Sequence, residues 1–382
     1  MSTTPKRGDK IGEYFKLDRA IDAPAGSFAR VYAAEDLQEN RQVAIKILRH
    51  KHLDLPKDEC EQRFEAFNRE AELLLKFDDD PRVMNLYGVG YLWKSYLLYE
   101  AKHLGTDIEQ FRAMRDEAMA NNWLPYLIIE PCRNEDSLHQ LVVHNPRGVR
   151  LPMIEAVELA LQLTDLLVKI HDNDIIYWDA KPAHAFWNGE QLKLIDWNVS
   201  YPLTEEYLAF LGGTKEELKK LDILILGRQF IYPAFIGLDF QTGQQPPSAG
   251  TTSANVVKET QAFYYRGDVQ LYGGERFLDP PVQAFLSRVV QSDEFDSAAM
   301  LREELENYAV QLGWRFTGKF PNAQATEALE HKRQALKSLR AAHAAITNAL
   351  DEIDNAHNVF ESADTNFLVE QTEALFKRSV IP

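Results

Sequence analysis

The stretch YWDAKPAHAFWNGEQLKLIDWN, residues 177–198, holds two aspartates, Asp179 and Asp196, on either side of a polar turn. Asn188 and Gly189 favour a tight hairpin turn between two short apolar segments. Two carboxylates that a fold brings together can bind a metal ion and accept a proton, although aspartates also cap turns. Other motifs in the sequence are needed to distinguish a metal-binding and proton-accepting site from a pair of turn-capping aspartates.

Composition narrows the class of protein. The chain has 382 residues, 45% of them apolar, and a net charge of -16 from 42 basic and 58 acidic side chains. Such an acidic chain disfavours general binding to nucleic acid or to an anionic membrane. With only Cys60 and Cys132, a disulfide framework is excluded and a cytoplasmic location is expected. The first ten residues lack the apolar core of a signal peptide, and no run of about 20 apolar residues predicts a membrane span.

The order of the predicted elements indicates an α+β fold with two lobes. Residues 11–48 read as short strands, ending in the apolar strand RQVAIKIL, and residues 58–77 read as an amphipathic helix. Two further strands flank residues 93–123, which we interpret as a long insertion of mixed polarity. After residue 150 the pattern is mainly helical. We therefore expect a disordered N-terminus over 1–10, a β-rich lobe over 11–130 and a helical lobe over 131–320.

Three more motifs precede the opening stretch. The turn PAGSFARVY can cradle phosphates with backbone N–H groups, with Gly26, Ser27 and Phe28 at its tip, or it can be an ordinary hairpin. Lys46 ends VAIK on an apolar strand and needs a counter-charge, for which Glu70 on the following helix is the candidate. An edge-strand lysine that reaches water is the other reading.

The third motif is LIIEPCRNEDSL, a strand that ends at Pro131. The backbone groups of Glu130 and Cys132 could pair with the edge of an adenine. A plain strand-to-helix connection would give the same pattern.

In this order, the motifs resemble the signature set of eukaryotic-type Ser/Thr protein kinases over about residues 11–310. YWDAKPAHAF stands where such kinases have H-R-D-L-K-P-E-N-I-L, and DWN stands where they have D-F-G. The resemblance implies a bilobal kinase-like fold that binds ATP and Mg²⁺. The cofactor-binding residues it implies are Gly26, Ser27, Phe28, Val31, Ala44, Lys46, Glu70, Ile129, Glu130 and Cys132.

The resemblance also assigns chemistry to the charged residues. Asp179 would accept the proton of a substrate hydroxyl, and Lys181 would stabilise charge on the transferring phosphoryl group. Asp196 would hold a metal ion, and Asp222 would buttress the catalytic loop from the F helix.

Several positions depart from the kinase pattern. His184 replaces the metal-binding asparagine of the loop, and an imidazole suits softer transition metals better than Mg²⁺. One metal site is therefore expected to be altered, with Mg²⁺ or Mn²⁺ as the ion; the alternatives are that His184 meets a phosphate or a carboxylate, or has a structural role. Tyr177 and Trp178 replace the His-Arg pair, which argues against activation by a phosphate in this region. No A-P-E follows Asp196, so an extended peptide platform is not expected. Trp178, Trp187 and Trp197 are expected to fill volume.

Residues 323–376 contain no glycine or proline and carry heptad-like apolar spacings. They predict either a coiled-coil-like helical extension that binds a protein partner or forms a homodimer, or helices folded back on the domain.

Three functions stay open from the sequence. The first is an ATP-dependent phosphotransferase that acts on Ser/Thr hydroxyls of a protein, with an altered metal site. The second is a pseudokinase that binds nucleotide or acts as a scaffold. The third is a small-molecule kinase.

Overall fold

The computed structural model describes residues 8–21, 28–95, 98–143, 151, 153–237, 280–291 and 294–311, and the isolated residues Ser338, Ala345, Ala349, Glu352 and Ile353. The chain divides into two units, Met1–Phe316 and Thr317–Pro382. The isolated residues are helical, and the rest of the predicted tail over 323–376 lies outside the described residues. The account below concerns the first unit.

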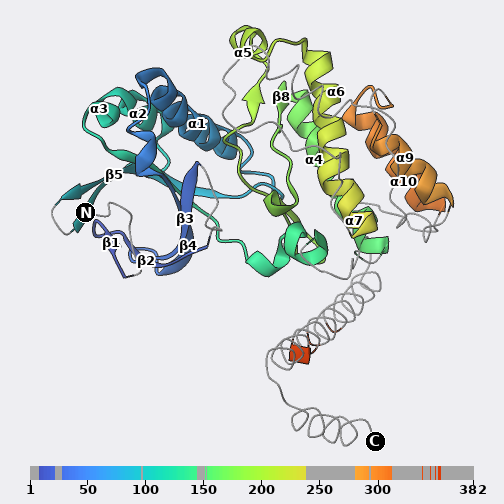
Figure 1. Ribbon diagram of the computed structural model, residues 1–382, viewed down its shortest axis with the longest axis horizontal. Coiled ribbons are helices and arrows are strands. Elements are labelled where there is room, and N and C mark those ends of the chain that lie inside the picture. Colours follow the sequence, from blue (N-terminus) through green and yellow to red (C-terminus); the bar gives the residue numbers. More distant parts are fainter. Residues whose placement is uncertain are drawn as a thin grey trace, which may run out of the picture. The chain divides into compact units, whose positions relative to one another are not determined.

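The N-terminal lobe is a closed seven-stranded barrel (Figure 1), in the order β1-β2-β3-β4-β7-β5-β6. Strand β4 is the centre of the lobe because six consecutive residues, 43–48, are buried in it. It pairs antiparallel with β3 on one side and with β7 on the other. The strands are β1 (Lys10–Ile11), β2 (Phe15–Ala20), β3 (Ala29–Asp36), β4 (Arg41–Leu48), β5 (Leu86–Ser95), β6 (Leu98–His103) and β7 (Leu124–Ile129).

Two strands of this barrel differ from the sequence-based expectation. Strand β1 begins at Lys10 and its neighbour Gly8 donates a backbone hydrogen bond to Leu17, so the predicted disordered segment 1–10 is too long at its C-terminal end. Residues 1–7 lie outside the described part. Strand β6 lies within the predicted insertion 93–123 and closes the barrel through a parallel pairing of Ile11 with Tyr99. Both strands lack the long apolar alternation that makes a strand visible in sequence.

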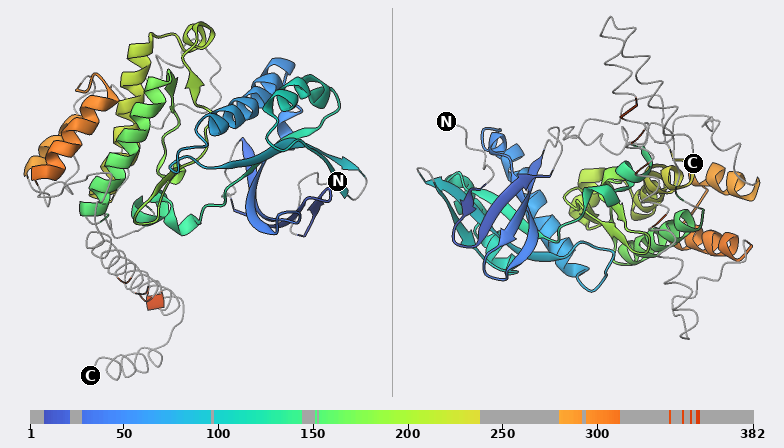
Figure 2. Two further views of the ribbon diagram at one scale, coloured as in Figure 1. Left: turned by 180° about the vertical axis from the view of Figure 1, so that it is seen from behind. Right: turned by 90° about the horizontal axis from the view of Figure 1, so that it is seen from below.

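Helix α1 (Lys57–Lys76) packs on the barrel through an apolar stripe that includes Phe64, Phe67, Ala71 and Leu74. The remainder of the 93–123 segment forms α2 (Ile108–Ala113) and α3 (Arg115–Ala120), which contact α1. Figure 2 shows these two short helices beside α1. The segment is therefore an ordered part of the lobe.

The second lobe is mainly helical, and its long helix α4 packs closely against α10. A π-helical turn, Gly227–Ile231, joins α6 to α7. None of the helices in the described part of the chain is both long and apolar enough to cross a bilayer. The helices are α4 (Met153–Asp172), α5 (Glu205–Leu211), α6 (Lys215–Leu226), α7 (Tyr232–Ile236), α9 (Pro280–Val289) and α10 (Ala298–Gln311).

Two small sheets organise residues 175–202, one within the stretch quoted above and one made by the residues on either side of it. Strands β9 (Ala185–Trp187) and β10 (Leu192–Leu194) form the expected hairpin, with Gly189 at φ 99° in the turn. Strands β8 (Ile175–Ile176) and β11 (Tyr201–Pro202) pair antiparallel, so the segments on either side of this hairpin are also joined. The predicted packing role of the three tryptophans is confirmed, because Trp178, Trp187 and Trp197 are all buried.

Candidate active site

Lys46 links the two lobes. Its Nζ lies 2.9 and 2.7 Å from the two carboxylate oxygens of Glu70 on α1, and 2.5 Å from Oδ1 of Asp196 in the helical lobe. The expected Lys46–Glu70 pair is thus present, and the edge-strand alternative is wrong because Lys46 is only 5% exposed.

This ion triad determines the charge states of its members. Burial by itself would lower the pKa of Lys46, but the charges of Asp196 and Glu70 outweigh it and raise that pKa above its ordinary value. Burial would raise the pKa of Asp196, and Lys46 followed by His184 holds it well below its ordinary value. At neutral pH the site therefore presents a fixed ammonium beside a fixed carboxylate.

The loop that carries Asp179 is anchored on Asp222 in α6, which is fully buried. Its Oδ2 accepts one hydrogen bond from the Tyr177 backbone N–H at 2.9 Å, and its Oδ1 accepts another from the Trp178 N–H at 2.8 Å. His171 Nε2 lies 3.0 Å from the same carboxylate. Trp178 has φ 65°, a left-handed backbone that costs a non-glycine residue on the order of 1 kcal/mol and needs such support.

Asp196 also has a left-handed backbone, with φ 63°. The residues around it hold this turn in place: the Tyr177 hydroxyl donates to the Ile195 carbonyl at 2.6 Å, and the rings of Tyr177 and Trp197 meet edge to face at 5.2 Å. Trp197 also packs against Phe77, which follows α1. The turn directs the Asp196 carboxylate towards Lys46 on one side and His184 on the other.

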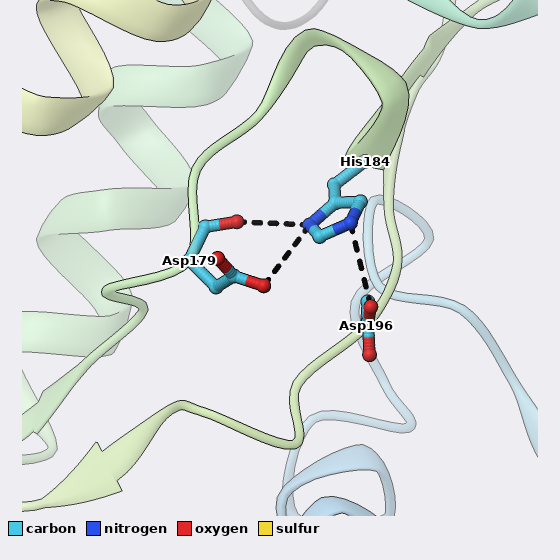
Figure 3. Close-up of side chains that lie close together, drawn as sticks. All are labelled: Asp179, His184 and Asp196. Carbon is cyan, nitrogen blue, oxygen red and sulfur yellow. Dashed lines mark hydrogen bonds and ion pairs between the residues drawn. The ribbon is translucent and has the colours of Figure 1, made fainter. Parts of the chain in front are cut away.

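His184 bridges the two aspartates (Figure 3). Its Nδ1 lies 2.8 Å from the Asp179 carbonyl oxygen, and its Nε2 lies 3.3 Å from Oδ2 of Asp196. A carbonyl oxygen only accepts, so Nδ1 must carry a proton. When Nε2 also carries a proton, it pairs with the Asp196 carboxylate. When Nε2 carries no proton, its lone pair is available to a metal ion.

Asp179, His184 and Asp196 meet the requirement for a divalent cation site, because each offers a ligand atom within 4.8 Å of the others. Two carboxylates and one imidazole form a mixed oxygen and nitrogen set of the kind that binds divalent cations. Lys181 Nζ lies 2.7 Å from Asp179 Oδ1, and this charge-assisted contact orients the carboxylate. The residues present therefore fit a bound metal ion.

The residues predicted for the adenine side come from neighbouring strands. Ala44 on β4 pairs with Ile129 on β7, and Val31 on β3 pairs with Lys46. Phe28 stacks on Phe67 of α1, with ring centroids 5.6 Å apart. Gly26 and Ser27, also predicted here, lie outside the described residues.

Glu130 has a second role that the sequence did not reveal. Its backbone N–H donates to the Asn85 carbonyl, and its carboxylate accepts from Asn85 Nδ2 at 2.9 Å and from Lys193 Nζ at 2.6 Å. Lys193 lies on β10, so the residue that follows β7 is tied to the β9–β10 hairpin. Cys132, two residues further, has a pKa raised by burial to about 12, which makes it a thiol and not a thiolate.

Comparison with known proteins agrees with this geometry. Residues 24–216, about half the chain, match the family described as the protein kinase domain. The chain belongs to the protein kinase domain family, as the resemblance predicted.

Two bacterial relatives illustrate the range of similarity. The chain is 26% identical over 191 residues to a probable serine/threonine-protein kinase PknB of Corynebacterium glutamicum, covering 50% of this chain and 24% of that protein. It is 29% identical over 180 residues to the serine/threonine-protein kinase pkn2 of Myxococcus xanthus, covering 46% of this chain and 17% of that protein. The shared part is thus a small fraction of each relative.

Proposed function

We propose that this chain is an ATP-dependent phosphotransferase that moves the γ-phosphoryl group to a Ser or Thr hydroxyl of a protein. The observation that supports it most is the position of Lys46, which joins Glu70 and Asp196 in one ion triad across the two lobes. A scaffold has no need to bury the Lys46–Glu70 pair, because replacing a buried ion pair by apolar residues is often neutral or stabilising.

The nucleotide's phosphates would meet Lys46. The ammonium is held by Glu70 from behind and stays charged, so it can offset the negative charge of phosphate oxygens. Val31, Ala44 and Ile129 would face the adenine, with the backbone of Glu130 and Cys132 at its polar edge. Phe28, Ser27 and Gly26 would cover the phosphates.

Asp179 would orient the substrate hydroxyl and take its proton. It is 18% exposed on its side chain, so it is reachable yet shielded from bulk water. Lys181 contacts the same carboxylate and would stabilise charge that develops on the transferring group. Positioning and charge would supply most of the rate enhancement.

Asp196 and His184 would hold the divalent cation, which when bound would neutralise charge on the phosphates. Nε2 of His184 would enter as a nitrogen ligand in place of an oxygen ligand. We therefore propose that Mn²⁺ supports the reaction better than Mg²⁺.

The acceptor would be a folded protein and not an extended peptide. Between Asp196 and Asp222 the chain forms the short strand β11 and the helices α5 and α6. The tail over 323–376 stays a predicted partner-binding or dimerising segment on sequence grounds.

Phosphoryl transfer from ATP labelled at the γ-phosphate tests the proposal, with Mg²⁺ and Mn²⁺ compared in parallel on mixed protein substrates. The wild type is expected to label Ser and Thr residues, faster with Mn²⁺. Asp179→Asn should reduce transfer at least 100-fold while it leaves ATP binding in place, since it removes the base and not the phosphate contacts. His184→Asn should move the preference towards Mg²⁺.

The other outcomes are equally informative. ATP binding without transfer in the wild type would favour a pseudokinase. Labelling of small hydroxyl compounds alone would favour a small-molecule kinase. Unchanged transfer by Asp179→Asn would contradict the assignment of the base.

A further inference from the structure

Arg69 precedes Glu70 on α1 and contacts the segment that follows Asp196. Its Nη2 donates to the backbone carbonyl of Asn198 at 2.5 Å. The guanidinium carbon lies 4.3 Å from the ring centroid of Tyr201, and Nη1 lies 3.5 Å from the Tyr207 hydroxyl. One side chain of α1 thus contacts three residues of the segment 198–207.

This arginine is buried, and the one carboxylate known to act on its charge, Glu72 of the same helix, does so without a direct ion pair. It is 7% exposed, and among the described residues it forms no ion pair. Its Nε–H has no hydrogen-bond partner among those residues. Burying a charge is costly unless other groups compensate, and here a carbonyl dipole and two aromatic faces do so. A side chain kept at this cost, with its hydrogen bonds and ring contacts on one segment, is well suited to hold that segment against α1.

The segment 198–207, which Arg69 contacts, is itself bound to the loop that carries Asp179. The Ser200 hydroxyl donates to the Tyr177 carbonyl at 2.8 Å, and Tyr201 pairs with Ile176 in the β8–β11 sheet. The Leu203 N–H donates to the Asp174 carbonyl at 2.6 Å. The contacts of Arg69 therefore connect α1, through this segment, to the loop that carries Asp179.

We propose that Arg69 is a positioning residue that holds α1, and with it Glu70, in the arrangement where Lys46 is engaged. The inference rests on the proposed function for its effect on rate. Arg69 fastens α1 to unmodified backbone and to tyrosine rings, so the active arrangement forms without a phosphate on the segment 198–207. Asn198 supplies the carbonyl through its main chain, and its side chain is not required.

A purely structural packing role is the competing explanation, and a double-mutant cycle separates the two. The variants are Arg69→Met, which keeps most of the apolar length, Glu70→Gln, and the pair together. Lys76→Met is the matched control, because Lys76 is an exposed basic residue at the end of the same helix. Rates of labelling from ATP are measured for all four and for the wild type.

If Arg69 acts through Glu70, Arg69→Met lowers kcat about tenfold, and the pair is no slower than Glu70→Gln alone. Lys76→Met keeps the wild-type rate. Multiplied losses in the pair, or a wild-type rate for Arg69→Met, would overturn the proposal.

Hydrogen exchange of the backbone amides provides a readout that needs no turnover. Arg69→Met is expected to accelerate exchange in residues 57–76 and 198–207 together, and to leave the β4 and β7 amides unchanged. Acceleration in only one of the two segments, or across the whole domain, would contradict the link. A wild type without transfer activity would contradict the proposed function, while the exchange result would still decide whether Arg69 joins these segments.

Discussion

At the scale of single residues, the ion triad gains from the attraction between its charges but pays the desolvation cost of burying them. Glu70 is completely buried and Lys46 nearly so, so each would be strongly destabilising without the other. Asp196 is the third member, and its side chain is 27% exposed, which leaves it accessible to a ligand. Buried Glu70 therefore holds Lys46 in place, and the more accessible Asp196 is available to a ligand.

The energetic consequence can be tested by removing one charge and then both. Lys46→Met should lower the free energy of unfolding by about 3–5 kcal/mol, because it leaves Glu70 buried without a cation. Lys46→Met combined with Glu70→Leu should recover most of that loss, since the apolar pair has no charge to desolvate. Urea denaturation followed by circular dichroism measures both.

Equal instability of the single and the double variant would contradict this explanation. It would mean that packing volume at these two positions, and not an unpaired charge, determines the stability of the lobe.

The same residue scale shows what the sequence could predict. Lys46, Glu70, Asp179 and Asp196 could be recognised because their neighbours form motifs with characteristic spacing. Arg69 could not, because its partners are more than a hundred residues away and two of its contacts are to aromatic rings. No local pattern distinguishes such an arginine from one on a solvated helix face.

At the scale of elements, α2 and α3 give the barrel lobe an additional layer over α1. Phe111 of α2 is fully buried and its ring lies 4.8 Å from that of Tyr91, whose hydroxyl donates to the Phe111 carbonyl. Arg112 pairs with Glu72 of α1 at 2.5 Å but is 54% exposed on its side chain. The apolar contact should therefore carry most of the attachment.

Substitutions on α2 test this division. Phe111→Ala should lower the free energy of unfolding by about 3–4 kcal/mol, as expected for a fully buried aromatic ring. Arg112→Ala should cost less than about 1 kcal/mol, because water and salt screen an exposed ion pair. Thermal and urea unfolding of the two variants gives the comparison. A larger effect for Arg112→Ala would show that ion pairs fasten the layer.

The turn after α1 is a second element with a clear electrostatic basis. Asp80 accepts hydrogen bonds from Arg82 Nε and Nη2, both at 2.8 Å, and Arg82 reaches the Gln162 carbonyl and Asp165 on α4. Burial would raise the pKa of Asp80, but Arg82 outweighs it and lowers that pKa to about 2. The turn thus joins the barrel lobe to the helical lobe through charge.

This shift predicts a pH dependence of stability. The folded pKa of Asp80 lies below the unfolded value of about 3.9, so its contribution is complete above that pH and is lost as the pH falls towards 2. The contribution should be about 2.5 kcal/mol, and it should be absent in Asp80→Asn. The free energies of unfolding of wild type and variant should converge between about pH 4 and pH 2. The exposed Asp172→Asn serves as control, and a constant gap across this range would contradict the assignment.

Elements with a strong pattern were predictable, and those without one were not. The strand over 41–48 and the helix over 57–76 agree with the sequence prediction to within a residue, because burial imposes a regular apolar pattern on both. Strand β6 was not predicted, because Tyr99 is the only apolar side chain among its described residues that is buried, and its pairing with β1 spans about ninety residues.

At the scale of the whole unit, the site exists only because the two lobes meet. Lys46 and Glu70 come from the barrel lobe and its helix, whereas Asp179 and His184 precede the β9–β10 hairpin and Asp196 follows it. The contacts of Glu130 with Lys193 and of Arg69 with Asn198 hold the lobes at two further points. Sequence spacing suggested the members of the site, but only the fold establishes that they meet.

Calorimetric titration of the domain with ATP in the presence of Mn²⁺ tests the central claim most directly, because the claim is that Lys46 and Asp196 together receive a metal-bound nucleotide. The wild type is expected to bind, and Asp196→Asn is expected to bind at least tenfold more weakly in Mn²⁺, which corresponds to about 1.4 kcal/mol. Without a divalent cation the two proteins should differ far less. Equal affinity of the two proteins with Mn²⁺, or no binding by the wild type, would contradict the account.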